Sequence, residues 1–262
     1  MTVVIYEHPL SPYAQKVKIS LDEKGVPYET KMPVAIGSGQ PDNDFLKANP
    51  RGEVPALIDG DVTVFDSTII LEYVEDKWPE PAMLPKSPAD RAKARTIEEV
   101  MDTAFEPINW GMGEIRWFKR AEGARAQEIE RRAAAQARGL YDWLSRLLGD
   151  AEWFGGSRFG WADLSVVPYL NGARGQGIGP HETSPLGKWL ARANARPSVE
   201  KAAKAAADSI KGMANVADAV KARLFKREYR DHRLEWMIRS GGLDVVIEGI
   251  KSDTIRFSNE LS

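Results

Sequence analysis

The first third of the chain alternates short apolar runs with amphipathic stretches. Residues 3–6, VVIY, are β-branched and aromatic, which predicts a short strand. In residues 13–24 the apolar side chains of Val17 and Leu21 lie four positions apart, the spacing of one helix face, and Gly25 follows as a stop signal. The chain is therefore predicted to open with a strand followed by a helix.

The same pattern continues to residue 78, and its strands are short and mixed in direction. Asp59 and Gly60 form a dipeptide typical of a tight hairpin between two strands. The predicted elements are, in order, a strand at 27–35, a loop at 37–43, a short helix at 44–49, a turn at 49–52, two strands within 53–65 and a helix at 66–78. Residues 1–78 are thus predicted to form a compact α/β domain.

Residues 79–88, PEPAMLPKSP, hold four prolines in ten residues. Because proline removes a backbone donor and breaks helices, this segment is predicted to be a linker between two domains. From 89 to 206 the apolar residues recur at helical spacing, and no strand pattern interrupts them. This spacing indicates an all-α domain of antiparallel helices, predicted at 89–118, 125–148, 161–171 and 184–206.

One of these helices has a recognisable start. With Gly160 as the N-terminal cap, Asp163 is the third helical residue, where a carboxylate favours the helix N-terminus. Phe159 and Leu164 stand at the positions of a hydrophobic staple. We expect a structural role for this motif.

The last stretch, residues 207–262, begins with a helical pattern that breaks at Gly241 and Gly242. Two later runs, DVVIEG at 244–249 and TIRF at 254–257, are predicted to be extended. The C-terminal residues are too apolar for a solvated tail, so we expect 225–262 to fold back over a substrate pocket or across a dimer. The apolar residues concerned are Phe225, Tyr229, Trp236, Val245, Val246 and Ile247.

Composition and charge exclude several classes of function. The chain has 262 residues, 43% of them apolar, and a formal net charge of −2, so no basic surface for nucleic acid is expected. No apolar run approaches the roughly 20 residues that span a bilayer, and the N-terminus does not resemble a signal peptide, so we expect a cytoplasmic protein that does not bind membranes. The chain has no cysteine, and its histidines at 8, 181 and 232 are far apart, so no disulfide, thiolate nucleophile or metal site is expected.

Ser11 and Pro12 stand at the predicted start of the first helix. Serine is a preferred N-terminal cap because its oxygen accepts an orphan backbone N–H, and proline is preferred at the first helical position. The same place is one where the helix dipole favours an anion, to which a hydroxyl can donate a hydrogen bond. Ser11 is therefore either a cap or a group that binds an anion.

Two further pairs allow the same double interpretation. Pro55 is either an edge-strand proline or part of a cis peptide bond that turns the backbone of Val54 outward to pair with an extended ligand. Asp66 and Ser67 are either helix caps or a clamp that receives an ammonium and a carboxylate. Together with Ser11, these features fit a short peptide with an amino-acid head and a reactive middle.

These residues resemble the cytosolic glutathione transferases. The similar segments are SPYAQKV, FLKANPRGEVPALIDGD, DSTIILEYVEDKWPEP, FGWADLSVVPYL and NARPSV, which follow one another in the family's order within residues 3–206. The resemblance implies a thioredoxin-like N-terminal domain, an all-helical C-terminal domain and a homodimer. It also implies glutathione as co-substrate, with no metal.

The resemblance implies roles for particular residues. Ser11 matches the serine that hydrogen-bonds the glutathione thiolate in the serine-type classes. Val54, before a cis-proline at Pro55, matches the residue whose backbone pairs with the cysteinyl part of glutathione. Asp66 and Ser67 match the pair that holds the γ-glutamyl head, although the family usually has Glu or Gln in place of Asp66.

Two other positions come from the same comparison. Gln40 lies where related classes place a side chain that contacts the glycyl end of glutathione. Gly160 stands where the family usually has Ser or Thr, which is a departure from its pattern.

The mechanism that the resemblance implies is stabilisation of a thiolate. A free thiol has a pKa of about 8.5, and lowering it by about two units needs about 2.7 kcal/mol of preference for the anion. One charge-assisted hydrogen bond from Ser11, together with a helix N-terminus, is of that order. The thiolate would attack a hydrophobic electrophile in a pocket of the helical domain. Candidate pocket residues are Leu10, Tyr13, Trp110, Met112 and Trp117. The alternative for the aromatic residues among them is ordinary packing in the core.

The strings FGWAD and WPEPA, with the long tail, also resemble glutathione-dependent enzymes of bacterial aromatic (lignin-fragment) degradation. One branch of those enzymes has a cysteine where Ser11 stands, so removal of glutathione through an enzyme mixed disulfide is not expected here. Conjugation, ether cleavage, dehalogenation and glutathione-assisted isomerisation stay open. So does a non-catalytic member of the family, acting as a binding or stress-related scaffold.

Overall fold

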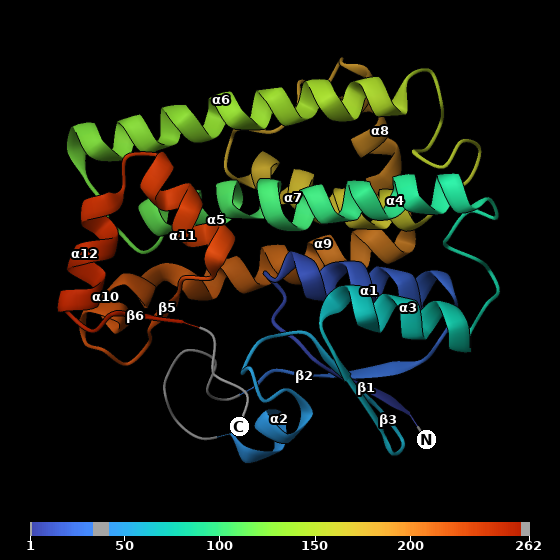
Figure 1. Ribbon diagram of the computed structural model, residues 1–262, viewed down its shortest axis with the longest axis horizontal. Helices are drawn as coiled ribbons and strands as arrows, with labels where there is room; N and C mark the ends of the chain where they lie inside the picture. The colour runs from blue at the N-terminus through green and yellow to red at the C-terminus, as the bar shows by residue number, and fades with distance from the viewer. Residues whose placement is uncertain (1, 34–41, 258–262) are drawn as a thin grey trace.

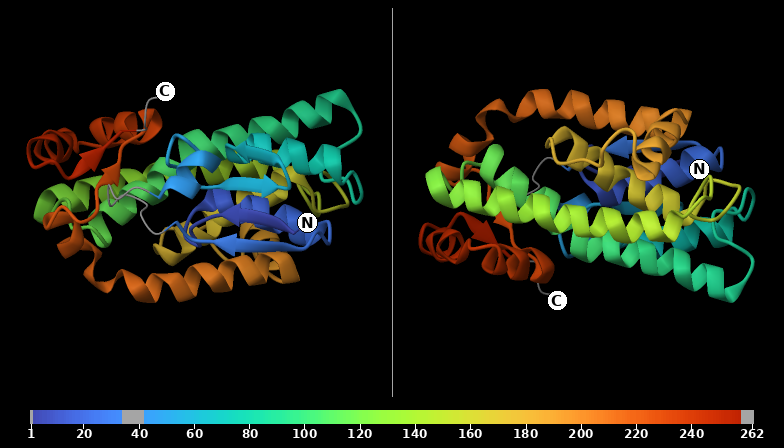
Figure 2. Two further views of the ribbon diagram at one scale, coloured as in Figure 1. Left: turned by 90° about the horizontal axis from the view of Figure 1, so that it is seen from below. Right: turned by 90° about the horizontal axis from the view of Figure 1, so that it is seen from above.

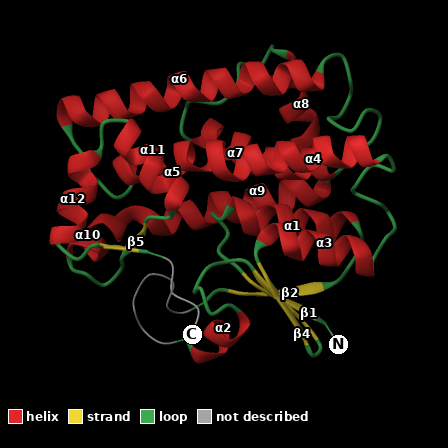
Figure 3. Ribbon diagram, in the orientation of Figure 1, coloured by secondary structure: helices red, strands yellow, loops and turns green. Residues whose placement is uncertain are grey.

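The computed structural model of the chain describes residues 2–33 and 42–257, and it consists of a small sheet domain joined to a larger helical domain (Figures 1 and 3). The sheet domain confirms the predicted order of strands and helices. Its elements are β1 (Val3–Tyr6), α1 (Pro12–Glu23), β2 (Tyr28–Lys31), α2 (Asn43–Ala48), β3 (Ala56–Asp59), β4 (Val62–Phe65) and α3 (Ser67–Lys77).

The four strands form a mixed sheet in the order β2-β1-β3-β4, in which only the β1–β2 pair is parallel. Successive side chains of a strand point to opposite faces. Ile5 and Leu57 accordingly join the main core, while Tyr6 and Ala56 pack with Phe45 of α2 on the other face. Helices α1 and α3 cover the first face (Figure 1), and this arrangement leaves the N-terminus of α1 at the end of β1.

The proline-rich linker is packed against both domains. The carboxylate of Glu75 accepts hydrogen bonds from the backbone N–H groups of Met83 and Leu84, at 3.1 and 2.9 Å. The carbonyl of Met83 in turn accepts from the N–H of Trp161, at 2.8 Å. Since Met83 and Leu84 are also buried, this segment fixes the two domains to each other.

The helical domain follows the prediction with one exception. The prediction of a single helix over 184–206 is wrong. The chain leaves the helical conformation at Arg196 because the ring of the next residue, Pro197, cannot continue a helix. The structure has α4 (Pro88–Val100), a π-helical turn η1 (Met101–Phe105), α5 (Glu106–Arg116), α6 (Gly123–Leu148), α7 (Trp161–Gly175), α8 (Pro185–Asn194) and α9 (Pro197–Ile210).

The start of α7 has the predicted capping arrangement. The N–H of Gly160 donates to Asp163 Oδ2 at 3.0 Å, and Phe159 and Leu164 are both buried. A Cβ at position 160 would lie 2.7 Å from the carbonyl oxygen of Met83 in the linker. This close approach explains why glycine, and no larger residue, fits here.

The C-terminal residues fold back along α5 as a separate small unit, hereafter the extension (residues 211–257) (Figure 2). The segment TIRF is extended as predicted, but DVVIEG lies in a helix: Val245, Val246 and Gly249 are buried at helical spacing. The extension contains η2 (Lys211–Asn215), α10 (Val216–Lys221), β5 (Arg227–Glu228), α11 (Asp231–Arg239), α12 (Leu243–Lys251) and β6 (Ile255–Arg256).

Candidate functional site

A cavity of about 1350 Å³ lies where the sheet domain, the helical domain and the extension meet. Five of the six residues predicted for catalysis and glutathione binding line it: Ser11, Val54, Pro55, Asp66 and Ser67. The sixth, Gln40, lies outside the described residues. The structure therefore brings together residues that are up to 56 positions apart in the sequence.

Ser11 is the N-terminal cap of α1. Its Oγ accepts a hydrogen bond from the N–H of Ala14 at 3.3 Å, so the capping interpretation is confirmed. In this bond the oxygen is the acceptor, which leaves the hydroxyl hydrogen free to turn toward the cavity. Within 2–33 and 42–257 no acceptor for that hydrogen is present, so capping and binding of an anion are compatible.

The peptide bond between Val54 and Pro55 is cis, the second of the two alternatives that the sequence allowed. The turn before it is tied by Asn49, whose Nδ2 donates to the carbonyl of Glu53 at 2.7 Å and whose Oδ1 accepts from the N–H of Arg51 at 3.0 Å. Strand β3 begins directly after it, at Ala56. The backbone of Val54 is therefore held just before the start of β3, beside the cavity.

Asp66 caps α3 in a conformation that is uncommon for a residue other than glycine, with φ 74°. Its Oδ1 accepts hydrogen bonds from the N–H groups of Thr68 and Ile69, at 3.0 and 3.3 Å. In the described part of the chain Oδ2 has no such partner. Ser67, the first residue of α3, is buried. Both residues line the cavity at the N-terminus of this helix.

Four of the five residues predicted to line the pocket for the electrophile do line the cavity, and one does not. Leu10, Tyr13, Trp110 and Trp117 line the cavity. Met112 does not line it: the residue is fully buried in the core. Because residues two positions apart on a helix do not share a face, Met112 points away from the side of α5 that carries Trp110.

Comparison with known proteins now decides the family. Residues 5–82 match the family model "Glutathione S-transferase, N-terminal domain", and residues 124–197 match "Glutathione S-transferase, C-terminal domain". A solved glutathione S-transferase structure from Rhodospirillum rubrum has 30% identity and a TM-score of 0.67, covering 77% of this chain and 91% of that one. The chain belongs to the glutathione S-transferase family.

Curated relatives agree with this assignment. Glutathione S-transferase U28 of Arabidopsis thaliana is 30% identical over 177 residues, 64% of this chain and 71% of its own length. Glutathione S-transferase Z2 of the same plant is 41% identical over 104 residues, 39% of this chain and 46% of its own length. The chain thus spans about half the length of the first relatives that it matches. A Stringent starvation protein A homolog of Haemophilus ducreyi is 30% identical over 162 residues, 60% of this chain and 68% of its own length.

A buried cluster of ion pairs beside the cavity could not be predicted from the sequence. Lys16 of α1 is fully buried, and its Nζ lies 2.5 Å from Glu98 Oε1 and 2.6 Å from Asp102 Oδ2. Burial lowers the pKa of Lys16, but the two carboxylates outweigh it and the net shift is upward. Since Lys16 looks like any charged residue on an amphipathic helix, no local signal marks it as part of a buried ionic link between the domains.

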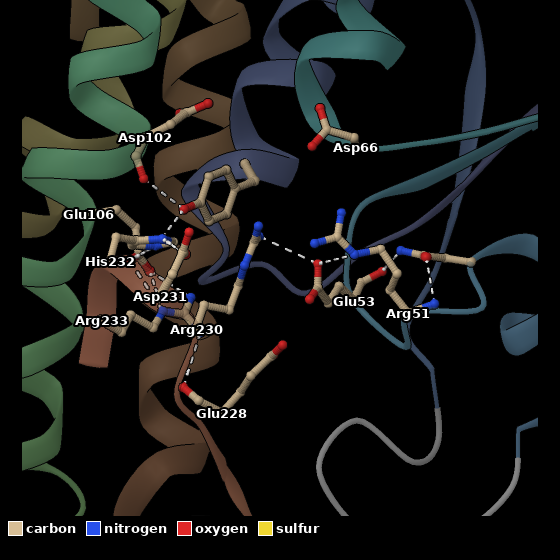
Figure 4. Close-up of polar contacts among 12 residues, drawn as sticks. Arg51, Glu53, Asp66, Asp102, Glu106, Glu228, Arg230, Asp231, His232 and Arg233 are labelled. Atoms are coloured by element: carbon tan, nitrogen blue, oxygen red, sulfur yellow. Dashed lines mark hydrogen bonds and ion pairs between the residues drawn. The ribbon is translucent and has the colours of Figure 1, made fainter. Parts of the chain in front are cut away.

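The extension supplies a second ionic group at the cavity wall (Figure 4). Arg233 Nη2 and His232 Nε2 lie 2.6 and 3.1 Å from the two oxygens of Glu106. Burial raises the pKa of Glu106, but Arg233 and His232 together bring it down to about 2. The Tyr13 hydroxyl donates to the carbonyl of Asp102 at 2.9 Å and lies 3.4 Å from His232 Nε2.

Two structural features are absent from the described residues. Across 2–33 and 42–257 there is no cluster of three histidine, cysteine, aspartate or glutamate side chains that could hold a metal ion. None of the helices over the same residues has the length and apolarity needed to cross a membrane.

Proposed function

We propose that this protein is a glutathione transferase that stabilises the glutathione thiolate for attack on a hydrophobic, aromatic electrophile. Ser11 donates its hydroxyl hydrogen to the sulfur, and the N-terminus of α1 adds its dipole. The backbone of Val54, next to Pro55, pairs with the cysteinyl part. Asp66 receives the ammonium of the γ-glutamyl head, and Ser67 its carboxylate.

One observation carries this proposal: the predicted groups converge on a single cavity that continues into the helical domain. The cavity exceeds the ordinary range of about 300–1,000 Å³ for ligand pockets, so it has room for glutathione and a second molecule. Aromatic side chains of the second wall include Trp110, Trp117, Phe118 and Phe225, the last two stacked at a centroid distance of 6.0 Å. Such a wall favours an aryl substrate.

The direct test is retention on glutathione-agarose together with conjugation of a generic aryl halide. We expect the wild-type chain to bind the resin, to elute with free glutathione and to form the thioether at a rate above that of the free reaction. A chain that neither binds glutathione nor turns over an aryl halide would contradict the proposal.

A second prediction concerns the head clamp. In the Asp66→Asn variant the amide oxygen can still cap α3, because Asn and Asp are equally good caps, but the negative charge is gone. We expect the glutathione dissociation constant to rise by about tenfold or more, since hydrogen bonds to charged groups contribute about 1.5–3 kcal/mol. Titration calorimetry measures this change, and the melting temperature should stay close to that of the wild type. An unchanged affinity would show that Asp66 is a cap alone.

A non-catalytic scaffold of the same family with a binding or stress-related role is the second candidate, and the name of one relative, a Stringent starvation protein A homolog, fits a stress-related role. Glutathione-dependent isomerisation is a further catalytic alternative. The co-occurrence of Ser11, Asp66 and Ser67 on one cavity supports catalysis over a scaffold. Ether cleavage and dehalogenation in aromatic degradation, a homodimer and a cytoplasmic location belong to the same proposal.

A further inference from the structure

The extension reaches the sheet domain at the turn before β3, next to Val54. Arg230, which joins β5 to α11, directs its guanidinium toward Glu53, with Nη1 3.4 Å from Oε2 (Figure 4). Nε of Arg51 lies 3.7 Å from the same oxygen. All three side chains line the cavity, so two cations from distant parts of the chain meet one residue before Val54.

The positions of these groups are fixed from both sides. Asn49 ties the turn that carries Arg51 and Glu53. On the other side, β5 pairs with β6, and Arg256 of β6 holds Glu228 of β5 at 2.9 Å. Arg230 therefore comes from an ordered segment.

In this part of the cavity, guanidinium groups outnumber the carboxyl groups with which they form ion pairs. Three guanidinium groups, those of Arg51, Arg230 and Arg256, surround the carboxyl groups of Glu53 and Glu228. Burial raises the pKa of Glu228, and the neighbouring Glu53 adds to this effect, against the lowering effect of Arg256 and Arg233. Because Arg51 and Arg230 share one carboxylate oxygen, the pair can accept a further anion.

Glutathione has two carboxylates and one ammonium. The γ-glutamyl carboxylate and the ammonium are assigned to Ser67 and Asp66 in the proposed function, on which this inference rests. The glycyl carboxylate lies at the other end of an extended tripeptide, up to about 10 Å away. Asp66 lies apart from the pair of cations, on the side of α3 (Figure 4), so the tripeptide can run from one to the other past Val54.

We propose that Arg230, together with Arg51, binds the glycyl carboxylate of glutathione, so that the extension completes the glutathione site. A guanidinium has five donors in a planar fork, so Arg230 keeps its contact with Glu53 while it takes a second carboxylate. Glu53 orients the guanidinium in the absence of ligand. Glutathione then bridges the sheet domain and the extension.

The test measures binding of two ligands, glutathione and its glycyl monoethyl ester, which lacks only the charge at that end. For Arg230→Gln we expect the dissociation constant of glutathione to rise about tenfold or more. The ester should bind the wild type more weakly than glutathione does, and Arg230→Gln should not weaken it further. Arg51→Gln should behave in the same way. Arg239→Gln is the matched control, because Arg239 is an exposed arginine of the same extension and does not line the cavity.

An equal loss of affinity for glutathione and for the ester in Arg230→Gln would overturn the inference, because Arg230 would then act only on the structure of the site. The proposed function would survive that result, since the wild type still binds glutathione. Failure of the wild type to bind either ligand would overturn the proposed function and the inference with it.

Discussion

Replacing Ser11 with alanine should lower the rate of conjugation at pH 6.5 by about a hundredfold, the low end of the loss seen when one preorganised donor to a developing or bound anion is removed. The hydroxyl hydrogen of Ser11 has no acceptor among the described residues and can face the cavity. Without it, the pKa of the bound thiol should return toward about 8.5, the value of a free thiol. Single-turnover rates measured against pH show this directly.

The pH profile separates catalysis from capping. Above about pH 9.5 the thiol is ionised without help, so Ser11→Ala should regain most of the wild-type rate there. The matched control is Ser87→Ala, since Ser87 also precedes a proline and caps a helix, α4, away from the cavity. Both variants should lose about 1 kcal/mol of stability through the lost cap. Only Ser11→Ala should change the pH profile; a profile equal to that of the wild type would make Ser11 a cap and nothing more.

The sequence predicted the elements whose signals are local. The β-branched run at 3–6, the hairpin dipeptide Asp59-Gly60 and the cap motif at Gly160 each depend on a few neighbouring residues, and the structure has them where they were expected. The two wrong predictions of secondary structure are also local in origin. Pro197 stands inside an unbroken apolar pattern, and DVVIEG is rich in valine and isoleucine, although its burial follows a helical period.

The contacts that shape the site depend on distant pairs, which periodicity cannot show. Lys16 meets Glu98 and Asp102 more than 80 residues away, and Arg230 meets Glu53 at 177 residues. Charged residues on amphipathic helices usually face water. The burial of Lys16 follows from domain packing. The apolar residues of the extension predicted that it folds back over a pocket, and residues of the extension do line the cavity; which of its charged side chains meet the sheet domain is seen only in the structure.

The largest effect on stability is expected at Asp163, which connects three segments of the helical domain. Its Oδ1 accepts from the N–H of Phe154 and from Nε1 of Trp189, at 3.1 and 2.8 Å, and Oδ2 accepts from Gly160. The carboxylate is fully buried, as is Trp189. In Asp163→Ala these donors lose their acceptor away from water, so we expect a loss of about 3–5 kcal/mol in the free energy of unfolding, measured with urea.

The pH dependence of that loss follows from the pKa of Asp163. Burial raises it to about 6, against the lowering effect of the donors, while in the unfolded chain it is near 3.8. A raised pKa means that the native state binds the proton more readily than the unfolded state does. The contribution of Asp163 to stability is therefore greatest below about pH 4 and decreases as the pH rises through 6. The difference between wild type and Asp163→Ala should accordingly be larger at pH 5 than at pH 7.5.

Two other variants distinguish this effect from the general loss of an acidic residue at a helix start. Asp163→Asn keeps one acceptor oxygen, so it should lose less stability than Asp163→Ala and remain folded if the alanine variant does not. Asp90→Ala removes an exposed carboxylate from the first turn of α4 and should cost about 1 kcal/mol or less. Equal destabilisation by Asp90→Ala and Asp163→Ala would contradict the prediction. The hydrogen bonds that Asp163 accepts would then add nothing to its favourable interaction with the helix dipole.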